Sequence, residues 1–315
     1  MRRFPDIKPF LITLISFFAL PLNSAVSADQ KLLSLVPPGA QVVAGMSATS
    51  PQGPPGNFLL VTHHNIVDLQ DFFALTGVDS SRSIHQVILV AVADNSGKLL
   101  EHSLLASGHF DQSRIYKSAT DNGAEITHYR NVAVLSIQPF ARERGSLDDV
   151  RLLAVLDCDI LLFGTIASVH QELDRYLAGT AADSSIVQRL DRLRREDETW
   201  CLLVAPVLSD EIRNVLGRLD PALVMSMENG GVFQYGIHYS GHVEFEYEIA
   251  ATSTLDPEAI SNSLETALAG PNANASLLLP RSGIAAGSHT MHGVVKISRR
   301  RYDEWLAEIS SHRTN

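Results

Sequence analysis

Residues 231–250 read GVFQYGIHYSGHVEFEYEIA, in which apolar and polar side chains alternate on either side of a Ser-Gly-His turn. Alternation with a period of two is typical of β-strands, so the segment predicts an antiparallel hairpin. A two-residue turn at Ser240-Gly241 would place glutamates on the apolar face, whereas a three-residue loop, 240–242, keeps one face apolar and the other polar. We therefore predict the three-residue loop, with His238 opposite Glu244 as a solvated pair.

Similar strand-like runs alternate with helical patterns along the rest of the chain. Two expected strands, 125–129 and 132–137, form a predicted hairpin about Arg130-Asn131, and Asp111 is a predicted helix N-cap. The other expected strands cover 41–44, 87–93, 99–110, 152–156, 160–163, 200–204 and 293–297, and the expected helices cover 66–76, 112–117, 169–177, 210–219, 257–269 and 302–309.

The order of these elements occurs twice, which indicates an internal duplication. Equivalent helix-face residues are offset by 143 positions early in each copy and by 129 at the end, where the second copy lacks one hairpin. Unrelated α+β chains also alternate in this way, and that alternative stays open. We predict an α+β protein of two related modules, residues 29–180 and 181–315, each with an antiparallel or mixed sheet and helices packed on one face.

Residues 1–28 have the features of a signal peptide. Arg2, Arg3 and Lys8 precede an apolar run over 10–20, and small residues at 26–28 supply a cleavage site. The run is too short to cross a bilayer, which needs about 20 residues, and no later segment is apolar enough over that length. We expect a cleaved signal peptide, no transmembrane segment in the mature chain, and a periplasmic or extracellular location.

The charge balance argues against one class of partner. The chain has 25 Lys and Arg against 35 Asp and Glu, a net charge of −10, and removal of residues 1–28 would make it −12. Phosphate binding needs a clustered positive field, and no basic stripe is present, so we expect no nucleic-acid partner. A hydrophobic fraction of 45% is typical of a folded globular protein.

Export would place Cys158 and Cys201 in an oxidising compartment, where a disulfide can form. Cys158 lies in a predicted turn between two aspartates, whereas Cys201 lies inside a predicted strand. Such positions rarely bring two Cα atoms within the roughly 7 Å that a bridge requires. We favour two unpaired cysteines, and pairing stays open.

Histidines are the main candidates for a metal site, because neutral imidazole binds zinc and copper. The most closely spaced are His63 with His64 and His289 with His292. In an extended segment, positions i and i+3 point to opposite faces, so His289 and His292 would not easily share one ion. We expect no metal and no other cofactor.

No motif fixes a catalytic chemistry. The sequence has no G-x-S-x-G nucleophile elbow, no S-x-x-K pair and no Gly-rich phosphate loop. A Ser-His-Asp site dispersed over loops would leave no motif, because triads assemble in space.

The segment Gly108-His109-Phe110-Asp111 is followed by a short helix, by a strand that ends at Tyr129, and by a hairpin over 152–164 that leads into a helix. This order resembles that of uncharacterised secreted bacterial proteins, over about residues 84–178. The motifs are loose, and His109 stands where those proteins have arginine. The resemblance implies secretion but no known activity, and it supplies no catalytic residue.

These observations favour an exported, non-catalytic envelope protein that binds or organises a protein or peptide partner. An exposed hairpin edge is one place where a peptide strand can bind. The alternative is a hydrolase or a metal-dependent enzyme with a dispersed site. The two are distinguished by whether a nucleophile, a base and a donor converge on one pocket.

Overall fold

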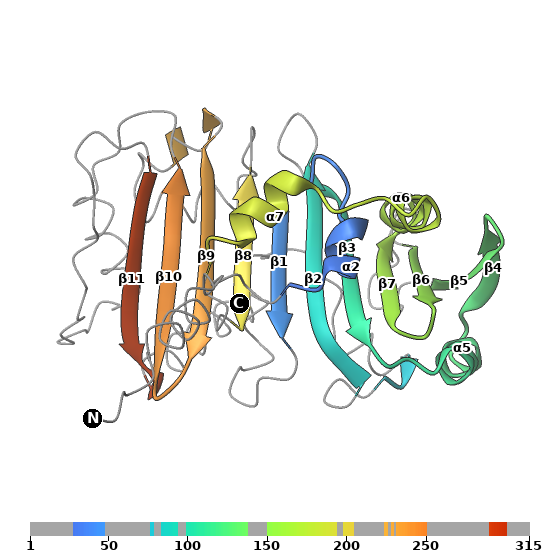
Figure 1. The fold of residues 1–315 in the computed structure, drawn as a ribbon. Helices are drawn as coiled ribbons and strands as arrows, with labels where there is room; N and C mark the ends of the chain where they lie inside the picture. Colours follow the sequence, from blue (N-terminus) through green and yellow to red (C-terminus); the bar gives the residue numbers. More distant parts are fainter. Residues whose placement is uncertain are drawn as a thin grey trace, which may run out of the picture.

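One antiparallel sheet of eleven strands runs through the part of the chain that the computed structural model describes (Figure 1). That part comprises residues 28–47, 76–78, 83–93, 99–137, 150–193, 198–204, 224–225, 228–229, 231–250 and 290–300. The order across the sheet is β11-β10-β9-β8-β1-β2-β3-β7-β6-β5-β4. The strands are β1 (Val42–Ser47), β2 (Ile84–Ala93), β3 (Leu99–Gly108), β4 (Glu125–Tyr129), β5 (Val132–Ile137), β6 (Arg151–Leu156), β7 (Ile160–Thr165), β8 (Thr199–Val204), β9 (Val232–Tyr239), β10 (His242–Ala250) and β11 (Thr290–Ser298).

The described helices begin at polar N-caps whose side chains accept a hydrogen bond from a backbone N–H of the first turn. The cap at Asp111 confirms the prediction, although its helix ends four residues later than expected. Two of these helices, α2 and α7, were not predicted. The helices and their caps are α2 (Gln30–Leu35, Asp29), α5 (Gln112–Asp121, Asp111), α6 (Ile166–Leu177, Thr165) and α7 (Ser184–Leu190, Asp183).

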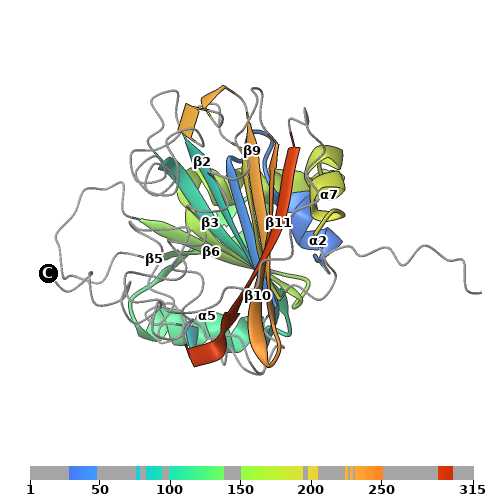
Figure 2. The same cartoon turned by 90° about the vertical axis from the view of Figure 1, so that its left-hand side faces the viewer.

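The sheet corrects the predicted fold class, which was α+β with two modules and helices on one face of each sheet. β8 pairs with β1, so strands from both predicted modules belong to one β-rich sheet. The helices also contribute to cores on both faces: α2, α6 and α7 to one, α5 to the other. Figure 2 shows α2 and α7 on one side of the sheet and α5 on the other. The physical reason is that central strands are apolar on both sides, as Ala44 and Val43 of β1 illustrate.

The contact between β1 and β8 depends on a glycine. Gly45 lies opposite Trp200 in the pairing, and Trp200 is 1% exposed. A Cβ added at Gly45 would overlap the indole ring, so the ring lies directly against the backbone of β1. The absence of a side chain at residue 45 therefore makes room for the largest buried residue of β8.

The two hairpins predicted in most detail are confirmed. Residues 232–239 pair with 243–250 around a loop at 240–242, and this is the register expected from the alternation. At the other end of the sheet, β4 and β5 are joined by Arg130 and Asn131, both with positive φ. Positive φ at both central residues is the geometry of a type I′ turn, which matches the twist of a hairpin.

The division into two modules stays a prediction. Around the β1–β8 contact, β9, β10 and β11 follow β8 in the order in which β2, β3 and β7 follow β1. A duplicated unit arranged about a twofold axis would give this order.

Several other predictions fall on residues that the structure does not describe. The signal peptide lies there except for its last residue, as do all or most of the helices expected at 66–76, 210–219, 257–269 and 302–309. Among the described helices, none combines the length and the apolar character needed to cross a membrane.

We expect Gly45→Ala to lower the free energy of unfolding by about 1–3 kcal/mol, because the new methyl group would displace the Trp200 indole. Gly241→Ala is the matched control: a Cβ there meets no atom within 4 Å, and we expect a change within about 0.5 kcal/mol. Urea denaturation measures both. Equal stability of the Gly45→Ala variant and the wild type would contradict the packing of the indole on β1.

Candidate functional site

Of the histidines predicted as metal candidates, His63, His64 and His289 lie outside the described residues. His292 lies on β11, where its Nε2 is 2.6 Å from Oε1 of Glu246. Within the described part of the chain, no three His, Cys, Asp or Glu side chains are arranged to hold a metal ion. The structure thus places His292 beside a carboxylate and leaves the other three candidates as predictions.

The face of β9 and β10 that the alternation predicts to be solvated is largely buried. Gln234 is 1% exposed, and its Nε2 donates to the carbonyl oxygen of Arg189 in α7. Glu246 of β10 is 6% exposed. The prediction of a wet face is therefore wrong here; at Gln234 the reason is that it did not include α7, which contacts this residue.

Polar contacts connect the side chains of this face. His238 lies opposite Glu244 as predicted, but its Nδ1 contacts Oε2 of Glu198 at 3.1 Å. Oε1 of Glu244 accepts a hydrogen bond from Nζ of Lys296 and contacts Nε2 of His242, both at 2.6 Å. These contacts link β9 to the residue before β8, and β10 to β11, by their side chains as well as by their backbones.

The two cysteines lie in different environments and are both free. Cys158 is exposed, in the turn between β6 and β7, with a φ of 60°. Cys201 is buried in β8, and burial raises the pKa of its thiol to about 12. At neutral pH Cys201 is therefore a protonated core residue and not a nucleophilic thiolate.

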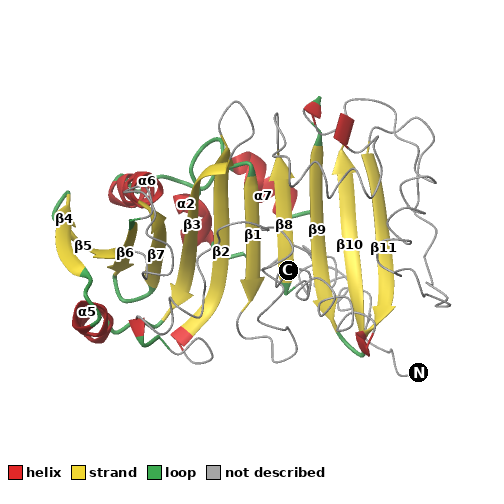
Figure 3. Cartoon of the chain, turned by 180° about the vertical axis from the view of Figure 1, so that it is seen from behind, coloured by secondary structure: helices red, strands yellow, loops and turns green. Residues whose placement is uncertain are grey.

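β4 forms one edge of the sheet, and in the described part of the chain it pairs with β5 alone (Figure 3). Residues 125–128 are exposed, and Ile126 keeps 51% of its surface accessible. Edge strands are commonly protected by charged side chains, above all lysine, by proline or by a β-bulge. β4 has one charged side chain, Glu125, but no lysine or proline in its sequence EITHY, and its register with β5 is regular.

The turn after β4 is held against α6. The Tyr129 ring stacks on His170 with centroids 3.8 Å apart, and its hydroxyl donates to Oδ2 of Asp174 at 3.2 Å. Nε of Arg130 lies 3.0 Å from Oδ1 of Asp174. Burial lowers the pKa of His170 despite the opposite effect of Asp174, so the stacked imidazole is neutral at pH 7. One end of β4 is thus fixed by α6, while residues 125–128 are exposed at the edge of the sheet.

The turn also determines which main-chain groups face the open edge. In a two-residue hairpin the flanking residues, here Tyr129 and Val132, form a hydrogen-bonded pair, and such pairs recur at every second residue. The N–H and C=O groups of Thr127 therefore point toward β5. Those of Ile126 and His128 point away from β5 and can bond to an added strand.

The sequence predicted β4 and β5 as strands, but it did not predict that β4 lies at the edge of the sheet. β4 is terminal because β3 pairs with β7 and not with β4, the next strand along the chain. That pairing is not visible in a local pattern. A weak signal was present at 125–128, where Glu-Ile-Thr-His lacks an apolar face.

No family model, curated protein or solved structure matches the chain.

We expect Tyr129→Ala to release β4 from α6, because it removes both the stack on His170 and the hydrogen bond to Asp174. Loss of about 2–3 kcal/mol of local stability would speed hydrogen exchange of the Thr127 amide roughly 30-fold to 150-fold. Tyr129→Phe keeps the stack and should cost about 1 kcal/mol. Amides of β2 serve as the internal reference. An unchanged Thr127 amide in the Tyr129→Ala variant would contradict this anchoring.

Proposed function

We propose that the protein is an exported, non-catalytic bacterial envelope protein that binds an extended segment of a partner protein by strand addition at β4. The edge at β4, which is open in the part of the chain that the structure describes, carries this proposal. The N–H and C=O groups of Ile126 and His128 point outward, and the side chains around them are exposed. An added antiparallel strand would satisfy these groups with main-chain hydrogen bonds, which supply affinity for many different sequences.

The side chains of β4 suggest the chemistry of the partner segment. Ile126 favours a β-branched or aromatic neighbour, since such cross-strand pairs contribute about 0.2–1 kcal/mol each. Glu125 and the net charge of −10 favour basic residues, because complementary charge speeds encounter and selects partners. The proposed ligand is therefore an extended, basic segment with alternating β-branched side chains.

The export part of the proposal has separate support. Residues 1–28 combine a basic start, an apolar run and small residues before the expected cleavage site. The resemblance of residues 84–178 to secreted bacterial proteins points in the same direction. A periplasmic or extracellular location would present β4 to other exported chains.

The test is selection of a phage-displayed random peptide library on the mature protein, followed by titration calorimetry with the synthetic peptides obtained. We expect peptides of alternating β-branched and basic residues that bind with micromolar Kd. Hydrogen exchange should show slower exchange at the amides of Ile126 and His128 in the complex. The Thr127 amide already bonds to β5 and should change little.

Two variants of one residue separate main-chain from side-chain recognition. His128→Pro removes the outward N–H, and proline is tolerated in an edge strand where its missing N–H faces solvent. We expect it to weaken peptide binding at least about tenfold. His128→Ala keeps the N–H and should bind within about threefold of the wild type. Selected peptides that bind the His128→Pro variant as tightly as the wild type would refute strand addition at β4.

A further inference from the structure

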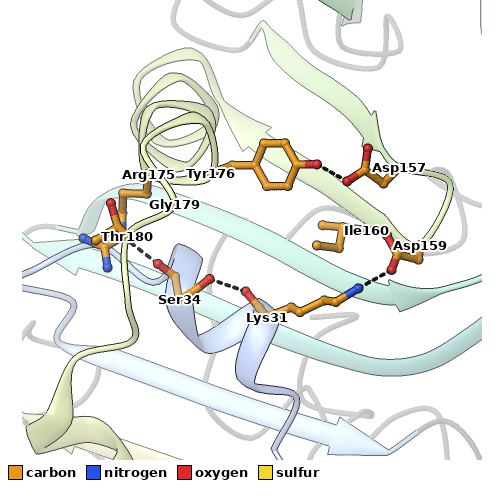
Figure 4. Close-up of a pocket in the computed structure, with 9 residues that line it drawn as sticks. All are labelled: Lys31, Ser34, Asp157, Asp159, Ile160, Arg175, Tyr176, Gly179 and Thr180. Atoms are coloured by element: carbon orange, nitrogen blue, oxygen red, sulfur yellow. Dashed lines mark hydrogen bonds and ion pairs between the residues drawn. The ribbon is translucent and has the colours of Figure 1, made fainter.

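A cavity of about 310 Å³ opens between α2, the end of α6 and the turn that joins β6 to β7 (Figure 4). This volume is at the lower end of the roughly 300–1,000 Å³ typical of small-molecule sites. The cavity shares no residue with the β4 edge. Its charged and phenolic lining residues are Lys31, Asp157, Asp159, Arg175 and Tyr176.

Hydrogen bonds hold the groups at both ends of this cavity in place. Nε of Arg175 donates to the carbonyl oxygen of Ser34 at 2.9 Å, and Nη2 donates to that of Ala181 at 3.1 Å. The hydroxyl of Tyr176 donates to Oδ2 of Asp157. This bond to Asp157 raises the pKa of Tyr176 to about 12, so the phenol stays a donor at neutral pH. A ligand would therefore meet preorganised partners.

The charges in the cavity are only partly neutralised by one another. Nζ of Lys31 lies 2.6 Å from Oδ2 of Asp159, and these two charges form a pair. The hydrogen bonds of Arg175 go to neutral carbonyl oxygens. Among the described residues, no carboxylate lies within 4 Å of the Arg175 guanidinium and no cation lies within 4 Å of Asp157. Beyond that distance, Asp183 interacts electrostatically with Arg175, and Lys31 with Asp157. Within the described part of the chain, neither Arg175 nor Asp157 has a direct ion-pair partner, so each can form one with a ligand.

A second carboxylate lies beside Asp157. Oδ2 of Asp159 is paired with Lys31, and its Oδ1 is buried and has no hydrogen-bond partner among the described residues. Because Oδ1 is covered by protein atoms, a ligand in the cavity does not reach it. The acidic end of the cavity thus offers a ligand the Asp157 carboxylate, next to a second carboxylate that is already paired.

We propose that this cavity binds a small zwitterion, of the class of amino acids and short peptides. Figure 4 shows Arg175 and Asp157 at opposite ends of the lining residues. Arg175 binds the ligand carboxylate through its remaining N–H groups, and Asp157 binds the ligand ammonium. A simple anion would leave Asp157 unpaired, and a simple amine would leave Arg175 unpaired. The proposal is independent of strand addition at β4.

A series of ω-amino acids, from glycine to 8-aminooctanoic acid, tests the proposal directly. Each compound carries one ammonium and one carboxylate, and the series varies their separation. We expect titration calorimetry on the mature protein to show one preferred chain length with Kd below about 1 mM. The alkylamine and the alkylcarboxylate of that length should each bind at least tenfold more weakly. Equal binding by either one, or no binding by the series up to about 10 mM, would overturn the proposal.

Variants locate the binding in this cavity. Asp157→Asn removes the charge, and asparagine tolerates the positive φ of residue 157, which is 48°. We expect it to weaken binding of the preferred amino acid at least tenfold. Asp121→Asn makes the same chemical change in an exposed ion pair of α5 and should leave binding unchanged. Thermal melting confirms that both variants fold, and equal affinities of the two would place the binding outside the cavity.

Discussion

The antiparallel pairing of β1 with β8 is the contact on which the arrangement of the whole sheet depends. β1 has β2 on one side and β8 on the other, so β8 to β11 join the rest of the sheet through this pair. The contact is close because Gly45 lets the Trp200 indole lie on the backbone. Apolar residues on both faces of the two strands then face the two cores, and each core spans strands from both parts of the chain.

Local patterns predicted the local parts of this fold. Alternation over 231–250 predicted the register of β9 and β10, because a one-residue shift would have buried glutamates in the apolar core. Which strands become neighbours is not a local property, so two sheets were predicted where one exists. The same limit applies to the proposed binding site. An exposed edge strand was expected, but that this strand is β4 depends on pairing between strands that are distant in the sequence. The residues that line the cavity lie between Lys31 and Thr180 and come from three separate segments of the chain.

α6 connects the two proposed binding sites without placing them together. Its middle, at His170 and Asp174, holds the turn of the β4–β5 hairpin. Its last turn supplies Arg175 and Tyr176 to the cavity. Its inner face packs into one core through Val169 and Leu173. One helix thus has a structural face and two surfaces with different chemistry, so substitutions at its exposed positions need not affect both sites.

Synthesis from the N-terminus makes β1 long before its partner β8, since Ala44 pairs with Cys201, 157 residues later. The strands β2 to β7 can assemble on one side of β1 in that interval. On the other side, a row of unpaired N–H and C=O groups stays open beside apolar side chains. Such an edge recruits strands from other chains, and incomplete domains are exposed to this during synthesis. A chaperone that covers β1 until β8 emerges would protect the nascent chain from aggregation.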